Sequence, residues 1–481
     1  MAEKMLQFTH VQRSMPAKRA PGERAHDFDE IYSEFSLKAA GAQAARCSQC
    51  GVPFCQQGCP LSNNIPDWLK LAAEGRLEEA WEVSTATNNM PEICGRICPQ
   101  DRLCEGICTI EQSGHGTVTI GSVEKFITDT AWEKGWVKPI SPPRERSQSA
   151  GIIGAGPGGL AAAEQLRRKG YQVTVYDAYD RGGGLLVYGI PGFKLEKPVV
   201  ARRIKHLDDS GVTFKFNTRI GPDISLQDLR KTHDTVLIAT GVYQAKDLKC
   251  PGAGSTGVLA ALDFLTASNR KSFGDAVPAF DDGTLNAEGK RVVVIGGGDT
   301  AMDCVRTAVR QGAKSVTCLY RRDRANMPGS QREVANAEEE GVVFEWLASP
   351  EAILDTKAGK AKAVRAAKMK LGEPDASGRQ SPVKTGDTMD VKADMVIKAL
   401  GFDPEDLPEL FGEPALTVNR WGAVRVDYAT METSLSGVYA AGDIVRGASL
   451  VVWAIKDGRD AAEAMHRAMK SAEKASKVAA E

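Results

Sequence analysis

GIIGAGPGGLAAAEQLRRKGYQVTVYD, residues 151–177, decides the fold of this chain. A short apolar strand leads into a glycine-rich turn, a helix follows as far as Gly170, and a second strand over residues 172–176 ends at Asp177. This order of strand, glycine loop, helix, strand and acid predicts a parallel βαβ unit that binds a dinucleotide. A glycine loop in an ordinary α/β core is the alternative, and the complete order of elements favours the nucleotide site.

Three glycines of the turn have separate roles. Gly154 allows the tight turn, Gly156 lets backbone amides approach a pyrophosphate, and Gly159 lets the helix pack closely on the strand. The N-terminus of the helix adds positive potential that favours phosphate. Asp177 lies 21 residues after Gly156, where its carboxylate can hydrogen-bond a ribose.

A second unit, RVVVIGGGDTAMDCVRTAVRQGAKSVTCLYRRD, occupies residues 291–323. Its second strand, residues 315–320, ends at Arg321 and Arg322, where an NAD-binding unit carries an acid. Two guanidinium groups suit a dianionic 2′-phosphate, which favours NADPH over NADH. A solvated turn is the alternative for such a pair, and the neighbouring charges Asp323 and Arg324 complicate the local balance. The candidate NADPH contacts are Gly296, Gly297, Gly298, Asp299, Thr300, Arg321 and Arg322.

Two later strands resemble further fingerprints of the two-dinucleotide-binding flavoproteins. DTVLIATG (residues 234–241) ends in Ala-Thr-Gly, and SLSGVYAAGD (residues 434–443) ends in Gly-Asp. In that family the aspartate of the Gly-Asp pair holds the ribityl chain of FAD, and the loop over residues 182–195 is a candidate for the isoalloxazine side. The candidate FAD contacts are Gly154, Gly156, Pro157, Gly158, Gly159, Asp177, Gly183, Gly184, Thr240, Gly241, Gly442 and Asp443.

Eight of the eleven cysteines stand in two runs ahead of both units, CSQCGVPFCQQGCP (residues 47–60) and CGRICPQDRLCEGIC (residues 94–108). Between them, residues 65–84 have the apolar spacing of two helices. Structural zinc prefers two close cysteine pairs with a longer gap. The observed spacings, followed by proline, favour iron–sulfur ligation. The remaining three cysteines form no close pair, so electrons from a flavin need the N-terminal cysteines as an exit.

Composition excludes several other classes of protein. The chain has 481 residues and a net charge of −1, which gives no electrostatic reason to bind nucleic acid or an anionic membrane. No apolar run approaches the roughly 18 residues of a membrane span. MAEKMLQFTH, residues 1–10, lacks the apolar core of a signal peptide, so we expect a cytoplasmic protein.

The order of a cysteine-rich helical segment, an FAD unit and an inserted NADPH unit resembles the small subunit of bacterial NADPH-dependent glutamate synthase over nearly the whole chain. The N-terminal part of dihydropyrimidine dehydrogenase has the same layout. The resemblance implies an α/β fold in which an N-terminal α-helical iron–sulfur domain precedes two Rossmann-like domains, with the NADPH domain inserted in the FAD domain. The implied boundaries are 1–145 for the cluster domain, 146–245 and 401–481 for the FAD domain, and 246–400 for the NADPH domain.

The family holds two 4Fe–4S clusters with interleaved ligands. In the dehydrogenase a glutamine supplies one ligand of the second cluster, and the matching segment here, residues 119–125, places Glu124 at that position. Cys94 stays an alternative, because thiolate is the commoner ligand. The resemblance therefore implies Cys47, Cys50, Cys55 and Cys108 for the first cluster, and Cys59, Cys98, Cys104 and Glu124 for the second.

The resemblance also implies the reaction. NADPH reduces FAD, and electrons pass through the clusters to a large subunit with FMN, which makes glutamate from glutamine and 2-oxoglutarate. Because hydride transfer needs only that the cofactors be positioned, no catalytic side chain is assigned. Two alternatives stay open: a related NADPH-dependent module that serves another partner, such as a pyrimidine-reducing subunit or ferredoxin, and a zinc-stabilised binding protein with vestigial nucleotide folds.

Overall fold

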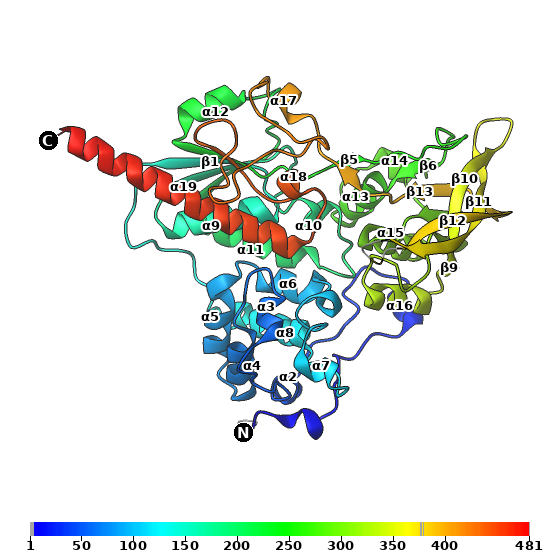
Figure 1. Ribbon diagram of the computed structural model, residues 1–481, viewed down its shortest axis with the longest axis horizontal. Coiled ribbons are helices and arrows are strands. Elements are labelled where there is room, and N and C mark those ends of the chain that lie inside the picture. The colour runs from blue at the N-terminus through cyan, green and yellow to red at the C-terminus, as the bar shows by residue number, and fades with distance from the viewer. Residues whose placement is uncertain (1–3, 376–377, 379, 481) are drawn as a thin grey trace.

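The computed structural model describes residues 4–375, 378 and 380–480, and its chain builds two parallel sheets beside a helical domain (Figure 1). The first sheet has the strand order β15-β4-β1-β2-β3 and is parallel throughout. Its central strands are apolar and buried on both faces, as a parallel sheet covered by helices requires. The strands are β1 (Ser149–Ile153), β2 (Gln172–Tyr176), β3 (Val212–Lys215), β4 (Thr235–Ile238) and β15 (Val438–Ala440).

Helices cover both faces of this sheet, and α9 (Pro157–Arg168) packs along α19 (Val451–Ala480) on one of them. The two helices meet at glycines, since a Cβ on Gly458 would lie 2.1 Å from the carbonyl oxygen of Gly158. Helix α19 continues without a break to Ala480. The other helices of this module are α10 (Leu185–Tyr188), α11 (Lys197–Asp209), α12 (Leu226–Thr232), α17 (Leu407–Leu410) and α18 (Asp443–Arg446).

The second parallel sheet has the order β6-β13-β7-β8-β9. A three-stranded antiparallel sheet, β10-β11-β12, covers one face and shares a core with it through Val293, Ile295 and Val364. The sequence analysis did not predict this antiparallel sheet. The elements are β6 (Val258–Ala260), α13 (Ala261–Ser272), α14 (Pro278–Asp281), β7 (Arg291–Ile295), α15 (Asp299–Arg310), β8 (Ser315–Tyr320), α16 (Gln331–Glu339), β9 (Val343–Trp346), β10 (Ala348–Asp355), β11 (Ala361–Pro374), β12 (Gln380–Lys392) and β13 (Met395–Lys398).

The chain crosses between the two modules twice. It leaves the first sheet after β4 and returns to it only at β15, so the second module is an insertion in the first, as predicted. The outgoing β5 (Gln244–Ala245) and the returning β14 (Phe402–Asp403) pair antiparallel to each other. This two-stranded ribbon ties the two crossings together.

The N-terminal part of the chain is helical, as expected. Trp68 lies at its centre, fully buried, and its Nε1–H donates to Asn63 Oδ1 at 2.8 Å. Gly75, with φ +79°, separates the two predicted helices α4 and α5. The elements are η1 (Gln7–Thr9), α1 (Pro21–Arg24), α2 (Leu37–Ala44), α3 (Phe54–Gln57), α4 (Ile65–Ala73), α5 (Leu77–Thr87), α6 (Pro91–Ile97), η2 (Gln100–Arg102), α7 (Thr109–Gln112) and α8 (Ile120–Glu133).

The helical domain is docked on the first sheet module through α6. Met90 and Ile93 belong to the same hydrophobic cluster as the α9 and α19 side chains. Beside them Arg203, on α11, donates from Nε to Glu92 Oε1 at 2.8 Å and from Nη2 to Glu92 Oε2 at 3.0 Å. Both side chains are buried, so this bidentate pair links the two parts without access to water. Within the part of the chain that the structure describes, no helix combines the length and the apolarity that crossing a bilayer requires.

The Arg203–Glu92 pair gives a prediction about stability. Arg203→Met would leave the Glu92 carboxylate buried and unpaired, which costs about 3–5 kcal/mol in comparable cases. Chemical unfolding followed by circular dichroism should show that loss. The double variant Arg203→Met with Glu92→Leu should recover much of it, because neither member of the buried pair remains. Lys205→Met, an exposed change on the same helix, is the matched control, and equal effects of Arg203→Met and Lys205→Met would contradict the prediction.

Candidate cofactor-binding sites

A cleft with about 1180 Å³ of empty space lies where the three parts of the chain meet. The first module contributes the β1–α9 loop, the end of β4 and the segment from Gly442. The inserted module contributes the start of α15 with Asp299 and Thr300. The helical domain contributes Ile97 and Pro99, the neighbours of Cys98. Nine of the predicted FAD residues line this cleft: Gly154, Gly156, Pro157, Gly158, Asp177, Thr240, Gly241, Gly442 and Asp443.

The glycines of the β1–α9 loop divide into two kinds. Gly154 has φ +107°, and a Cβ there would lie 2.4 Å from the carbonyl oxygen of Ala239. A Cβ on Gly159 would lie 2.0 Å from the carbonyl oxygen of Gly154. A Cβ on Gly156 would meet no atom within 4 Å, so this residue keeps the cradle open toward the cleft. The loop therefore has the tight turn, the close helix packing and the open face that a pyrophosphate needs.

Gly183 and Gly184, also predicted as FAD contacts, lie behind this loop. The N–H of Gly183 donates to the carbonyl oxygen of Ala155 at 2.8 Å. Gly184 has φ +54°, and a Cβ there would lie 3.1 Å from the Cα of Gly156. The structure therefore gives both residues a supporting position, and neither lines the cleft.

Three polar groups in the cleft fit a ribose and a polyol chain. Asp177 is held by the backbone, since its Oδ2 accepts the Ala155 N–H at 2.6 Å, and burial raises its pKa. Burial also raises the pKa of Asp443 to about 7. The hydroxyl oxygen of Thr240 is buried with no hydrogen-bond partner among the residues the structure describes. Buried polar groups need partners, so these side chains and the open glycine cradle fit FAD.

The loop after β7 repeats the arrangement. A Cβ on Gly296 would lie 2.2 Å from the carbonyl oxygen of Ala399, and one on Gly297 would lie 2.3 Å from the Tyr320 ring. A Cβ on Gly298 would meet nothing within 4 Å. Asp299 accepts the Ser330 N–H at 3.0 Å and so fixes the entry of α15. The open position at Gly298 fits the phosphates of a second dinucleotide.

Arg321 and Arg322 follow β8 at the edge of the sheet to which the Gly296 loop also belongs. Among the described residues, neither guanidinium group has an ion-pair partner, and Arg322 Nε is buried without a hydrogen bond. The neighbouring charges are already engaged, because Asp323 accepts from Asn326 and Arg324 pairs with Glu338. Two unpaired guanidinium groups at this strand end fit a 2′-phosphate.

The first predicted set of thiols gathers around the turn after α2. Burial raises the pKa of Cys47, and nearby Cys108 and Cys50 raise it further. Burial raises the pKa of Cys55 to about 12, with further contributions from Cys47 and Cys108. Gln49 donates to Cys47 Sγ from its backbone N–H at 3.5 Å and from Nε2 at 3.4 Å. The four thiols therefore share one electrostatic environment, with N–H···S hydrogen bonds of the kind that tune iron–sulfur sites.

The second set lies between α6 and α8, and it includes both candidates for the last ligand. Cys94 hydrogen-bonds to Cys98, which together with burial raises its pKa. Burial raises the pKa of Glu124 to about 8, and its Oε1 accepts from Asn88 Nδ2 at 3.2 Å. The same asparagine contacts Cys94 Sγ at 3.8 Å. The Glu124 carboxylate lies close enough to raise the pKa of three thiols, those of Cys59, Cys98 and Cys104. Cys94 also interacts with Cys59 and Cys98.

Neither set is compact enough for a single ion. Among the described residues no three His, Cys, Asp or Glu side chains come close enough together to share one metal ion. Seven or eight thiols with one carboxylate are a donor set of the kind that iron–sulfur clusters use.

Sequence reasoning missed three features of the cleft. Lys194, from the first module, donates to Asp303 of α15 at 2.8 Å, and both side chains line the cleft. Tyr243 is half-buried there, and Ile97 and Pro99 bring the peptide around Cys98 to the same wall. Lys194 lies in the loop that was proposed beside the isoalloxazine, and Asp303 lies one helical turn after Asp299. The helical spacing of Asp299 and Asp303 was the only signal that the sequence offered.

Two family models match the chain. The model described as dihydropyrimidine dehydrogenase domain II, 4Fe-4S cluster, matches residues 24–136. The model described as pyridine nucleotide-disulphide oxidoreductase matches residues 149–458. The structure is similar to that of Mycobacterium tuberculosis FprA in complex with NADPH, with a TM-score of 0.58 and 21% identity over 69% of this chain and 86% of that one. These findings confirm the predicted fold and the cofactor types FAD, NADPH and 4Fe–4S.

Curated relatives match over the whole length. The glutamate synthase [NADPH] small chain of Azospirillum brasilense is 65% identical over 481 residues, covering 100% of this chain and 99% of that one. The protein of the same name from Escherichia coli (strain K12) is 46% identical over 467 residues, covering 96% and 98%. The chain therefore belongs to the family of glutamate synthase [NADPH] small chains, and it is an NADPH-dependent oxidoreductase.

Proposed function

We propose that this chain is the electron-input subunit of glutamate synthase. NADPH reduces FAD in the shared cleft, and electrons pass through two 4Fe–4S clusters to a large subunit that carries FMN and makes glutamate from glutamine and 2-oxoglutarate. The observation that carries the proposal is the cleft itself, because the β1–α9 loop, the start of α15 and the peptide around Cys98 form its walls. The name "small chain" of the relatives supports a larger partner.

The proposal assigns parts of the chain to roles. Residues 1–145 form the cluster domain, 146–245 and 401–481 bind FAD, and 246–400 bind NADPH. We assign the first cluster to Cys47, Cys50, Cys55 and Cys108, and the second to Cys59, Cys98, Cys104 and Glu124, with Cys94 as the alternative ligand. The proposed FAD contacts are Gly154, Gly156, Pro157, Gly158, Gly159, Asp177, Gly183, Gly184, Thr240, Gly241, Gly442 and Asp443, and the proposed NADPH contacts are Gly296, Gly297, Gly298, Asp299, Thr300, Arg321 and Arg322.

Exposure within the cluster domain supports an order of transfer. Cys98, of the second set, stands between Ile97 and Pro99, which line the cleft, whereas Cys50 and Cys55 of the first set are half-buried. Between those two cysteines, Val52 is 55% exposed and Phe54 is 47% exposed. Exposed apolar side chains beside a redox centre suit a partner that takes electrons there. We therefore place the first cluster on the side of the large subunit.

The cluster assignment predicts a metal content and a ligand. Protein purified without oxygen should contain about eight irons per chain, and zinc in their place would exclude the electron route. Glu124→Ala should alter the electron paramagnetic resonance spectrum of one cluster, because it removes a ligand. Cys94→Ala is the matched change on the other candidate and should leave both spectra intact. The reverse pattern would assign the fourth ligand to Cys94.

The arginine pair predicts nucleotide preference. Replacing Arg321 and Arg322 by Gln should weaken NADPH binding by about tenfold per residue, since each loses charge-assisted hydrogen bonds to the 2′-phosphate. NADH binding should change little, as it has no such phosphate. Arg324→Gln, next to the pair but bonded to Glu338, is the control. Equal losses for both nucleotides would show that the arginines act on the fold or the pyrophosphate.

The division of labour between subunits predicts what the chain does alone. The isolated chain should reduce artificial dyes with NADPH, because that reaction needs only the cleft. It should make no glutamate, since nothing in the sequence resembles a glutaminase. Mixing with the large subunit should couple NADPH oxidation to glutamate formation from glutamine and 2-oxoglutarate. Glutamate formation by the chain alone, or no coupling in the mixture, would overturn the proposal.

A further inference from the structure

Residues 15–35 form an arm that leaves the helical domain and reaches the inserted module. The arm folds back on itself, since the Arg19 N–H donates to the Ile31 oxygen at 2.9 Å and the Ser33 N–H donates to the Ala17 oxygen at 2.9 Å. Helix α1 is its tip. Figure 1 shows this dark-blue segment crossing from the helical domain to lie beside α16. The arm is therefore a separate connection between domains that are distant in the sequence.

Arg24, at the tip of the arm, is fully buried against the end of α16. Its Nη2 donates to Glu339 Oε2 at 2.6 Å, and its Nε lies 2.9 Å from Glu340 Oε1. Lys18, on the outgoing limb, also donates to Glu339, at 2.7 Å. A buried guanidinium group is costly unless it is paired, so this contact fixes where the arm meets the inserted module.

Glu340 also binds two arginines of α15, and these arginines contact the first module. Its carboxylate also accepts from Arg306 at 2.8 Å and from Arg310 at 2.7 Å. The guanidinium carbon of Arg310 lies 3.9 Å from the ring centroid of Phe193, and that of Arg306 lies 4.4 Å from it. Phe193 lies in a loop of the first module, directly before Lys194. The charged network thus runs from the arm through the inserted module to the FAD module.

The arm also contacts the loop around Phe193 directly. The rings of Phe28 and Phe193 lie 6.2 Å apart, and a Cβ on Gly192 would lie 2.6 Å from the carbonyl oxygen of Phe28. Lys194, the next residue of the loop, pairs with Asp303 on α15, and both line the dinucleotide cleft. A displacement of the arm would therefore move side chains at the wall of the cleft.

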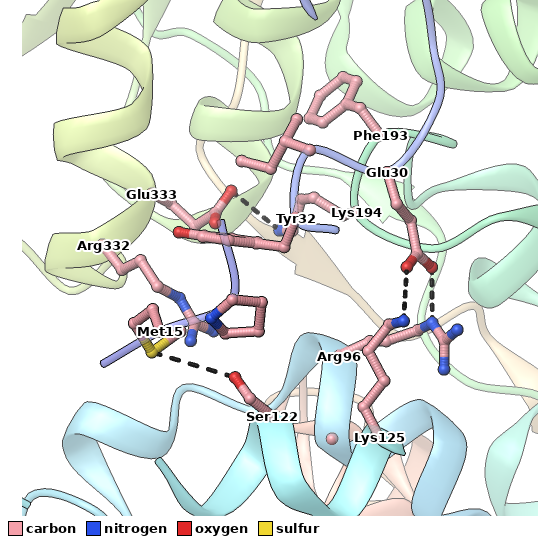
Figure 2. Close-up of a pocket in the computed structure, with 13 residues that line it drawn as sticks. Met15, Glu30, Tyr32, Arg96, Ser122, Lys125, Phe193, Lys194, Arg332 and Glu333 are labelled. Atoms are coloured by element: carbon pink, nitrogen blue, oxygen red, sulfur yellow. Dashed lines mark hydrogen bonds and ion pairs between the residues drawn. The ribbon is translucent and has the colours of Figure 1, made fainter. Parts of the chain in front are cut away.

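Figure 2 shows the small polar cavity around which these parts meet. Glu30 of the arm points to Arg96 and Lys125 on helices α6 and α8 of the helical domain, and pairs with both. Lys194 and Glu333, from the first and the inserted module, lie on the opposite wall. The arm is thus in contact with all three other parts of the chain at one place.

We propose that Arg24 is a positioning residue for hydride transfer, and that the arm holds the inserted module in register with the FAD module. NADPH can bind to its own module without the arm, but its nicotinamide must also stack on the flavin across the cleft. A misplacement of about 1 Å by a remote change can slow such a step about a hundredfold. The inference does not depend on which partner receives the electrons.

The test compares Arg24→Gln with Arg19→Gln in the holoprotein. Arg19 pairs with Asp27 inside the arm and does not reach α16, so it is the matched control. In anaerobic stopped-flow at saturating NADPH, Arg24→Gln should slow flavin reduction at least about tenfold, while the dissociation constant for NADP⁺ stays within about threefold. Hydrogen exchange should rise in α16 and in residues 189–195. Arg24→Lys should restore part of the rate, because it keeps the charge without the planar fork.

A purely stabilising arm gives a different result. Arg24→Gln would then lower the unfolding temperature but reduce flavin at the wild-type rate under saturating NADPH, which would overturn the proposal. Equal losses in NADP⁺ affinity and in rate would overturn it too. If Arg24→Gln does not fold, Glu339→Gln makes the same comparison, because that side chain is 40% exposed and contacts both Lys18 and Arg24. A wild-type rate in Glu339→Gln would likewise reject the positioning role.

Discussion

The Glu340 carboxylate is the contact on which the arrangement of the modules depends. It is buried and paired with guanidinium groups from two separate parts of the chain: Arg24 from the arm, and Arg306 and Arg310 from α15. Removing such charges from water is costly, and only a complete set of partners offsets that cost. A shifted module would leave at least one charge buried without a partner.

The same principle holds the helical domain. The buried Glu92–Arg203 pair places α6 against the first module, and the residues directly after α6 reach the cleft. Ile97 and Pro99 therefore take the peptide around Cys98 to the cleft, whose other walls include the β1–α9 loop and the start of α15. The cleft is thus a product of inter-module contacts. No single module contains it.

Local sequence patterns predicted the elements whose signal is local. The strands β2 and β8 have the bounds that the sequence indicated, because an apolar run between a helix cap and a charged residue marks both ends. The antiparallel strands β11 and β12 carried no such signal, since much of β12 is exposed and polar. The arm could not be predicted either. The one short helix of the arm gives no periodicity. The position of the arm is fixed by contacts with residues more than 300 positions away in the sequence.

The candidate sites divide in the same way. The glycines at 154, 156 and 159 could be assigned from spacing, because turn, cradle and helix packing are all local requirements. The Lys194–Asp303 pair could not, since its members are 109 residues apart and meet only in the folded chain. The fourth ligand of the proposed second cluster could not be assigned from spacing for another reason. Cys94 and Glu124 both contact Asn88, so the fold brings both candidates to one place.

Modules that stay closed around the cleft are consistent with the route that we propose for the electrons. An oxidoreductase that reduces a second substrate at its flavin must open the flavin to that substrate. Here the described cysteines of the two nucleotide modules form no disulfide, and the peptide around Cys98 already stands at the cleft wall. Electrons can leave through that wall one at a time while the modules stay closed on the nucleotides. Buried ion pairs that hold the modules together are therefore compatible with turnover by the proposed route, because no step of that route requires the modules to separate.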